Sequence, residues 1–290
     1  MIKPLEIGVC SWSIDRRYLM RSLATAADPL ALRVVQIGFF TDEAVRDADA
    51  TEILRAAAAA GMTLCGSFVG FEKEDYSSIA AIAATGGFAP DDAWPDRLQI
   101  ARRVGELTAE MGVYTLAVHA GSVPDDASSP DFAKLVDRVG EVAEAASECG
   151  VRLLLETGQE SARTLLRFLE AVDRPTVGVN FDPGNFVIYG TDEPAAAVSA
   201  LKGCIELVHV KDAVRSSRPG VEYGRPAPLG TGDAAIPRVI NKLRANRYAG
   251  PLLLECRPED TDLHGMRAAA DYLRSLVADT TDPPCATGVA

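Results

Sequence analysis

Four potential metal ligands lie at the ends of apolar runs in the second half of the chain. The runs LLLET, VNFDPGN, LVHVKD and LLLEC each bring one such side chain to a strand end, and these are Glu156, Asp182, His209 and Glu255. A carboxylate at the end of a buried strand is costly unless it is paired or ligated. Because consecutive strands would bring the four side chains together, the pattern predicts one site for a divalent metal ion.

The donor set also predicts which metal ion the site prefers. Three carboxylates and one imidazole suit Mn²⁺, which is our first choice, and Mg²⁺, Co²⁺ and Zn²⁺ are the alternatives. Taken singly, each residue also has a structural interpretation, such as a helix-capping aspartate or a salt-bridged glutamate. Four of them at equivalent places favour the metal site, with about one ion per chain.

Three further side chains are expected beside this site. His119, in AVHAG, is predicted to bind substrate or to support a ligand, and its structural alternative is a hydrogen-bonded histidine at a strand end. Lys211, in HVKD, is expected to contact a substrate oxygen or phosphate, or else to pair with Asp212 or a barrel carboxylate. Trp12, in CSWS, is expected to form a wall of the substrate pocket, and His264 is expected to face solvent.

The elements that must position these residues follow from hydrophobic periodicity. Short apolar runs alternate with longer amphipathic stretches, which indicates parallel strands joined by crossover helices. The eight runs lie near residues 5, 33, 62, 114, 151, 176, 205 and 251. Helical spacing followed by glycine marks residues 96–112, 130–150 and 235–250. A doubly wound sheet shows the same alternation, but CSWSID stands where such a sheet usually has a glycine-rich phosphate turn.

We therefore predict an α/β protein with a single (β/α)₈ TIM barrel over residues 1–278, followed by a mobile tail over residues 279–290. Long insertions at residues 70–94 and 213–233 follow the third and seventh runs and are candidate lids. We expect the segment from Ala213 to Gly232 to close over the bound molecule and to bring at least one arginine to it.

The composition excludes several classes of partner. The chain has 290 residues, 29 of them basic and 41 acidic, and a formal charge of -12 repels nucleic acid and anionic lipid. The six cysteines are scattered without CxxC pairs, which favours reduced thiols. No signal peptide or membrane span is recognisable, so we expect a cytoplasmic protein without a membrane partner. The sequence does not decide between a monomer and a homo-oligomer.

The runs LLLETG, NFDPGN, HVKD and LLLEC resemble those of the sugar phosphate isomerase/epimerase superfamily, which has the xylose-isomerase-like TIM barrel and includes ketose 3-epimerases and hydroxypyruvate isomerases. The resemblance covers nearly the whole chain, and PLGTGDAAIPRVINKL is similar to the loop and helix before the last strand. It implies that Glu156, Asp182, His209 and Glu255, from the fifth to eighth strands, hold the metal ion.

The resemblance also implies a reaction on a small carbohydrate, in which Glu156 and Glu255 act as acid and base on opposite faces of the substrate. A proton next to a carbonyl leaves only if the developing enediolate is stabilised, and a metal ion supplies that charge. Arg215 matches a substrate-binding arginine of the ketose 3-epimerases, with Arg218 and Arg225 as alternatives. Asn185 stands where those epimerases have a histidine, and an amide binds a hydroxyl but takes no proton.

Other functions fit the same barrel. A lyase or dehydratase would run β-elimination on a keto-sugar or related polyol with the same metal site. Apurinic endonucleases share the barrel, but they need many histidines and a basic groove, which three histidines and a charge of -12 do not supply. A barrel that only binds a ligand or a partner predicts a missing metal ligand, and all four are present.

Overall fold

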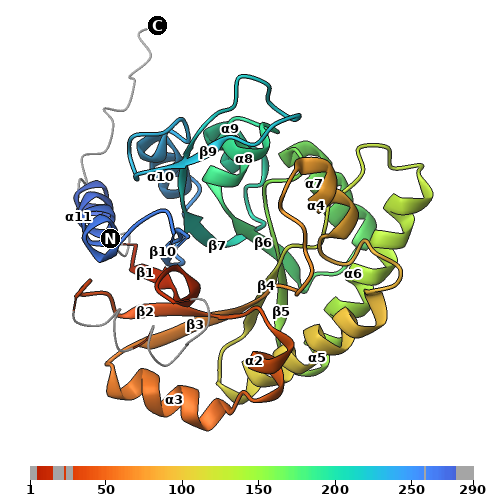
Figure 1. The fold of residues 1–290 in the computed structure, drawn as a ribbon, viewed down its shortest axis with the longest axis horizontal. Coiled ribbons are helices and arrows are strands. Elements are labelled where there is room, and N and C mark those ends of the chain that lie inside the picture. The colour runs from red at the N-terminus through yellow and green to blue at the C-terminus, as the bar shows by residue number, and fades with distance from the viewer. Residues whose placement is uncertain (1–4, 16–22, 24–28, 258, 279–290) are drawn as a thin grey trace, which may run out of the picture.

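A closed barrel of parallel strands lies at the centre of the molecule (Figure 1). The computed structural model describes residues 5–15, 23, 29–257 and 259–278. The barrel strands are β1 (Ile7–Cys10), β2 (Val34–Phe39), β3 (Thr63–Val69), β4 (Thr115–Val118), β5 (Arg152–Glu156), β6 (Val177–Phe181), β7 (Ile205–Val210) and β10 (Leu252–Leu254). Their order is β1-β10-β7-β6-β5-β4-β3-β2, closing on itself. The predicted TIM barrel with eight strands is confirmed.

Helices surround the barrel and cover its outer face (Figure 1). They are α2 (Asp42–Arg46), α3 (Ala50–Ala59), α4 (Ile79–Thr85), α5 (Trp94–Glu110), α6 (Pro130–Glu148), α7 (Ala162–Val172), α8 (Pro183–Tyr189), α9 (Pro194–Ala200), α10 (Ile236–Ala245) and α11 (Leu263–Ala278). A short 3-10 turn, η1 (Ser11–Ser13), follows β1. The three helices expected from periodicity correspond to α5, α6 and α10, and Ser129 caps α6 with its hydroxyl, just before a proline.

Side chains alternate between two hydrophobic clusters along the barrel strands. Leu153 and Leu155 of β5 pack outward into the large cluster that contains the helices, whereas Leu154 packs into a small inner cluster. The inner cluster is made of Cys10, Trp12, Val34, Phe68, Ala117, Leu154, Leu207 and Leu253. Because side chains on a strand repeat every two residues, the residues two positions after Leu154, Leu207 and Leu253 also point into the barrel.

The long segment after β3 has structure of its own. It contains α4, and the buried side chain of Arg97 donates to the carbonyl oxygens of Thr85 and Gly87 at 2.8 and 2.5 Å. Glu74 Oε1 accepts from the backbone N–H of Gly87 at 2.8 Å. The segment between β3 and α5 is therefore held in place by hydrogen bonds to α5 and within itself.

The segment after β7 forms a small antiparallel hairpin. Strands β8 (Asp212–Val214) and β9 (Arg225–Ala227) pair with each other and form a sheet separate from the barrel. The buried carboxylate of Asp212 accepts backbone N–H bonds at 2.9 to 3.1 Å from Gly230, Gly232 and Ala234. A Cβ on Gly232 would collide with this carboxylate, so only glycine permits the close approach. One side chain therefore joins the start of the hairpin to the chain that follows it.

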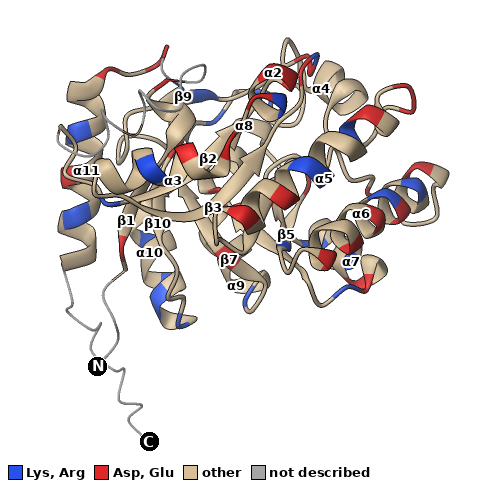
Figure 2. Cartoon of the chain, turned by 90° about the horizontal axis from the view of Figure 1, so that it is seen from below, with Lys and Arg blue, Asp and Glu red and all other residues tan. Residues whose placement is uncertain are grey.

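The described surface carries charges of both signs. Figure 2 shows acidic and basic residues interspersed on α5 and α6, and Arg103 of α5 pairs with Glu106 and Glu110. These helices carry no basic face in that view. No helix within the described residues is long and apolar enough to cross a membrane, and the described cysteines are free. His264 is exposed, as expected, and the predicted tail at 279–290 lies outside the described residues.

Candidate metal centre

The four predicted ligands converge at one end of the barrel. One ligand atom from each of Glu156, Asp182, His209 and Glu255 lies within 4.8 Å of the others. Glu156, His209 and Glu255 each come two residues after a leucine of the inner cluster, which turns them into the barrel. Among the described residues, these four form the group of potential metal ligands that lie this close together. The strand ends therefore bring together the side chains that the sequence singled out.

The His209 ring is held in a fixed orientation. Its Nε2 lies 2.6 Å from Gln36 Oε1, and its Nδ1 lies 2.7 Å from Glu156 Oε1. Because the amide oxygen of Gln36 only accepts, Nε2 carries a hydrogen and Nδ1 faces the carboxylates. The amide nitrogen of Asn180 lies 3.1 Å from both ring nitrogens. All three side chains are fully buried.

The two amide side chains that contact the His209 ring, Gln36 and Asn180, lie at irregularities in the barrel. The pairing of β2 with β3 shifts register between Val35 and Gln36, and that of β6 with β7 shifts between Val179 and Asn180. Such bulges redirect side chains next to functional sites. Neither Gln36 nor Asn180 was predicted as a site residue.

Asp182 has two separate contacts, one for each carboxylate oxygen. Its Oδ1 accepts from the backbone N–H groups of Gly184 and Asn185 at 2.8 and 3.2 Å, so the residue caps α8. Its Oδ2 lies 2.8 Å from Lys211 Nζ. Asp182 therefore both caps a helix and belongs to the cluster of potential metal ligands.

Glu255 is held by two side chains. Trp12 Nε1 donates to Glu255 Oε1 at 3.0 Å, and Lys211 Nζ lies 2.7 Å from Glu255 Oε2. Lys211 thus pairs with two barrel carboxylates and not with Asp212. Trp12 is 7% exposed and packs against Phe40, Phe68 and His209.

His119 lies directly beside Glu156. Its Nε2 is 2.6 Å from Glu156 Oε2, on the carboxylate oxygen that does not face His209. Burial lowers the pKa of His119, but the carboxylate of Glu156 raises it to about 9. His119 therefore holds one oxygen of Glu156 while the other faces the cluster.

The charges of the cluster keep its two glutamates ionised. Burial alone would raise the pKa of Glu156, but His119 and His209 lower it to about 2. Burial opposes ionisation of Glu255 in the same way, but Lys211 and His209 hold its pKa well below the usual range. For Asp182, burial raises the pKa in spite of Lys211. Both glutamates are therefore negatively charged at neutral pH, and the charged carboxylate is the form that binds a cation or accepts a proton.

The arrangement fits a divalent cation. Ligands on opposite sides of an Mg²⁺-sized ion, each about 2.1 Å from it, are about 4.2 Å apart. The candidate ligand atoms lie within 4.8 Å of one another, close to that separation. Three carboxylates and one imidazole, in the part of the chain that the structure describes, supply a hard donor set and an excess of negative charge.

The remaining predicted substrate residues are divided between two places. Asn185 lines a cavity beside the cluster, and its amide donates to the carbonyl of Thr157 at 3.1 Å. A Cβ at Gly158, where φ is +141°, would overlap Asn185, so glycine is needed there. Arg215 does not line this cavity, since its guanidinium donates to the carbonyl of Asp192 at 3.1 Å. Of the three arginines considered for substrate binding, Arg215, Arg218 and Arg225, only Arg225 lines the cavity.

One buried carboxyl near the site was also missed. Glu160 is 7% exposed, and burial raises its pKa to about 7, with His119 acting in the opposite direction. It follows Glu156 by four residues in ETGQE, a segment with no apolar periodicity that would indicate burial.

A family model described as the xylose isomerase-like TIM barrel matches residues 25–276 of the chain. The crystal structure of a xylose isomerase domain protein from Planctomyces limnophilus is 30% identical, with a TM-score of 0.85 over 94% of this chain and 97% of that one.

A structure of L-ribulose 3-epimerase has a TM-score of 0.68 at 19% identity, over 96% of this chain and 100% of that one, and shows the fold alone. Inosose dehydratase from Mesomycoplasma hyopneumoniae (strain 7448) is 26% identical over 170 residues, which are 52% of this chain and 56% of that protein. The chain thus spans about half the length of this curated relative.

Proposed function

The chain belongs to the xylose isomerase-like TIM barrel family, and we propose that it is a metal-dependent isomerase or epimerase of a carbohydrate. The observation that carries the proposal is the placement of two glutamates in one cluster of potential metal ligands. Glu156 ends β5 and Glu255 follows β10, with β6 and β7 between those strands in the barrel order. The two carboxylates therefore approach the same space from different sides.

In this proposal, Glu156, Asp182, His209 and Glu255 hold one divalent cation, with Mn²⁺ the first choice. When bound there, the cation supplies positive charge that makes a proton next to a carbonyl easier to remove. Asp182 and His209 are suited to holding it without moving. Their orientations are fixed by the cap of α8 and by the bond to Gln36.

The two glutamates are suited to proton transfer. Their low pKa values leave each as a carboxylate at neutral pH, so either can accept a proton from the substrate carbon. Isomerisation and epimerisation both need the proton returned, the first to a neighbouring carbon and the second to the opposite face. His119 and Lys211 hold the carboxylates of Glu156 and Glu255 in place. In this proposal, both side chains also contact substrate oxygens.

A second candidate is a lyase that runs β-elimination on a keto-sugar or related polyol. It begins with the same proton removal but loses a leaving group instead of regaining the proton. The similarity to inosose dehydratase favours this candidate, and so does Asn185, which takes no proton where the ketose 3-epimerases have a histidine.

Incubation of the Mn²⁺-loaded protein with a panel of ketoses and 3-keto-sugars in D₂O tests the proposal. Deuterium at an inverted carbon means epimerisation, deuterium on a carbon next to a relocated carbonyl means isomerisation, and loss of a leaving group means elimination. If neither exchange nor product forms with any member of the panel, the enzymatic proposal is wrong.

A further inference from the structure

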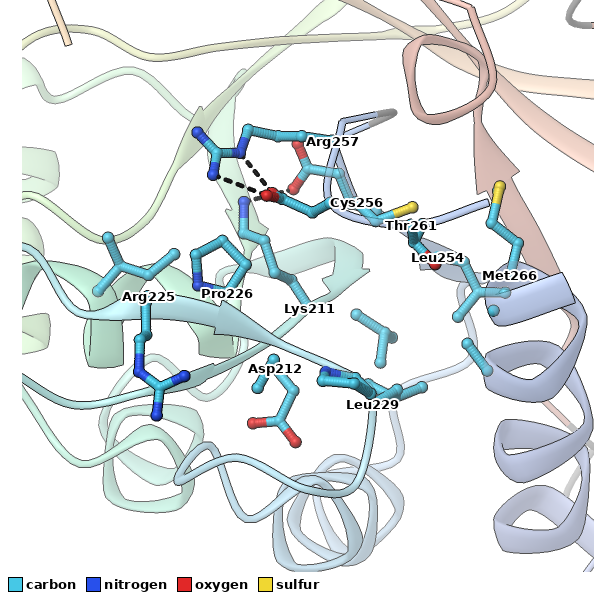
Figure 3. A pocket seen from close by; sticks show the side chains of 18 of the residues that line it. Lys211, Asp212, Arg225, Pro226, Leu229, Leu254, Cys256, Arg257, Thr261 and Met266 are labelled. Carbon is cyan, nitrogen blue, oxygen red and sulfur yellow. Dashed lines mark hydrogen bonds and ion pairs between the residues drawn. The ribbon is translucent and has the colours of Figure 1, made fainter. Parts of the chain in front are cut away.

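A cavity of about 660 Å³ adjoins the candidate metal centre (Figure 3). It reaches Asn185, Lys211 and Glu255 at the centre, and it continues between the β8–β9 hairpin and α11. Asp182 and His209 are not among the residues that line it. The cavity therefore begins at the charged cluster and extends well away from it.

The wall beyond the charged cluster is largely apolar. Its aliphatic part includes Ile188, Leu229, Leu254, Met266 and Ala269, whereas Arg225, Arg257, Asp260 and Thr261 supply polar groups elsewhere in the lining. Figure 3 shows Leu254 and Met266 next to each other on the right of the view, with Lys211 and Pro226 on its left. A carbohydrate hydroxyl placed against the aliphatic side chains themselves would lack a hydrogen-bond partner there, which is unfavourable.

Flat side chains complete the wall. Tyr76 and Tyr223 line the cavity together with Pro226 and Pro228. Tyr76 is 45% exposed, so part of its ring is accessible from solvent. An exposed aromatic side chain that faces a cavity is typical of a site for a ring.

The cavity is also larger than a free sugar requires. A cavity of about 150 Å³ is enough to bind benzene. A six-carbon sugar has about twice as many heavy atoms as benzene, so on the same scale it needs roughly 300 Å³. If a sugar occupies the end at Lys211 and Glu255, a similar volume of the 660 Å³ remains for a further group.

We propose that this cavity binds an apolar group, most simply an aromatic ring, that is joined to the sugar of the substrate. The substrate is then a glycoside or a similar conjugate and not a free sugar. The inference rests on the proposed function, because the sugar must bind at the metal centre for its substituent to reach Leu254 and Met266.

Binding separates this inference from catalysis. Titration calorimetry of the Mn²⁺-loaded full chain would compare phenyl glucosides with methyl glucosides, in both anomeric forms. We expect a phenyl glucoside to bind at least tenfold more tightly than the methyl glucoside of the same anomer, which corresponds to about 1.4 kcal/mol. A difference below threefold for both anomers would overturn the inference.

One substitution tests the location. Ala269→Phe places a ring into the cavity from the partly buried face of α11, and it should reduce the preference for phenyl over methyl to below threefold. Ser275→Phe is the matched control, because Ser275 is exposed on the same helix and does not line the cavity. A preference that survives in Ala269→Phe would place the apolar site elsewhere and overturn the assignment.

The D₂O exchange assay with the keto forms of the same glycosides distinguishes the two proposals. Exchange on free 3-keto-glucose with no preference for the phenyl glycoside leaves the proposed function standing and overturns the inference. Preferential binding of the phenyl glycoside without any exchange or elimination supports the cavity and overturns the proposed function.

Discussion

Gln36 and His209 are joined side chain to side chain, with 2.6 Å between Gln36 Oε1 and His209 Nε2. The two residues are far apart in the sequence, on β2 and β7. Because the bond fixes which ring nitrogen faces the cluster, we expect it to affect the affinity for a metal ion without direct contact between Gln36 and the ion.

Replacement of Gln36 by Leu should therefore weaken Mn²⁺ binding by about 10- to 100-fold, the usual effect of losing such a supporting partner. Titration calorimetry of the chelator-treated protein measures the change. Gln99→Leu serves as the control, since Gln99 is exposed on α5. Equal affinities in the parent and Gln36→Leu would show that the bond does not orient the ligand.

The candidate metal site leads to a second prediction. Elemental analysis should find about one divalent ion per chain, and Asp182→Ala or His209→Ala should lose it. Addition of Mn²⁺ at about 100 times its Kd should stabilise the parent by about 2.7 kcal/mol and raise its thermal midpoint. The absence of Mn, Mg, Co and Zn after supplementation would remove the metal from the proposal.

The two glutamates are expected to be indispensable for proton exchange. Glu156→Gln and Glu255→Gln keep the side-chain shape but lose the base, and each should lower the exchange rate by about 10²- to 10⁴-fold. Glu206→Gln is a matched control, because Glu206 pairs with Arg152 at the other end of the barrel strands, at 2.6 Å. Activity within tenfold of the parent for either cluster variant excludes that glutamate from acid/base work.

The arginines of the predicted lid should differ in their effects. Arg225 lines the cavity, whereas Arg218 pairs with Glu222 at the surface and Arg215 donates to the carbonyl of Asp192. Arg225→Ala should therefore raise KM the most, by at least threefold, or about 0.7 kcal/mol. Steady-state kinetics on all three alanine variants checks this. If each lies within threefold of the parent, the segment is not a substrate clamp.

Glu160 predicts how stability depends on pH. Its pKa in the folded protein is about 7, above the ordinary value of 4.5, so the folded state binds this proton more tightly than the unfolded state does. The resulting stabilisation is complete below about pH 4.5 and is lost as the pH rises through 7, with a total of roughly 3 kcal/mol.

Denaturant unfolding of the parent and of Glu160→Gln between pH 4.5 and 8 measures the effect. The parent should lose stability relative to the variant as the pH rises. Glu144→Gln, at an exposed position of α6, should follow the parent. A constant difference between Glu160→Gln and the parent across this range would contradict the prediction.

The sequence alone was sufficient to predict the barrel and the four candidate ligands, for a physical reason. Charged side chains at the ends of apolar strands stand out, and parallel strands bring their ends together. Gln36 could not be recognised in the same way, because its contact with His209 depends on a register shift between β2 and β3. Arg215, expected at the substrate, does not line the cavity, and its guanidinium donates to the carbonyl of Asp192. Such local geometry leaves no periodic pattern in the residues.

The carboxylate of Asp212 fixes the two ends of the segment that contains the hairpin, so the sequence between those ends can vary more than the barrel can. Because this one side chain binds the backbone of Gly230, Gly232 and Ala234, the start of β8 and the approach to α10 stay in place whatever lies between them. Residues 215–229, which include part of the cavity wall, are also joined to α8, where the backbone N–H groups of Gly220 and Gly224 donate to the carbonyl oxygens of Tyr189 and Ile188. Changes during evolution or in the laboratory are therefore expected at the positions between these contacts. Substrate range can diverge through this segment while the barrel and its charged cluster remain the same.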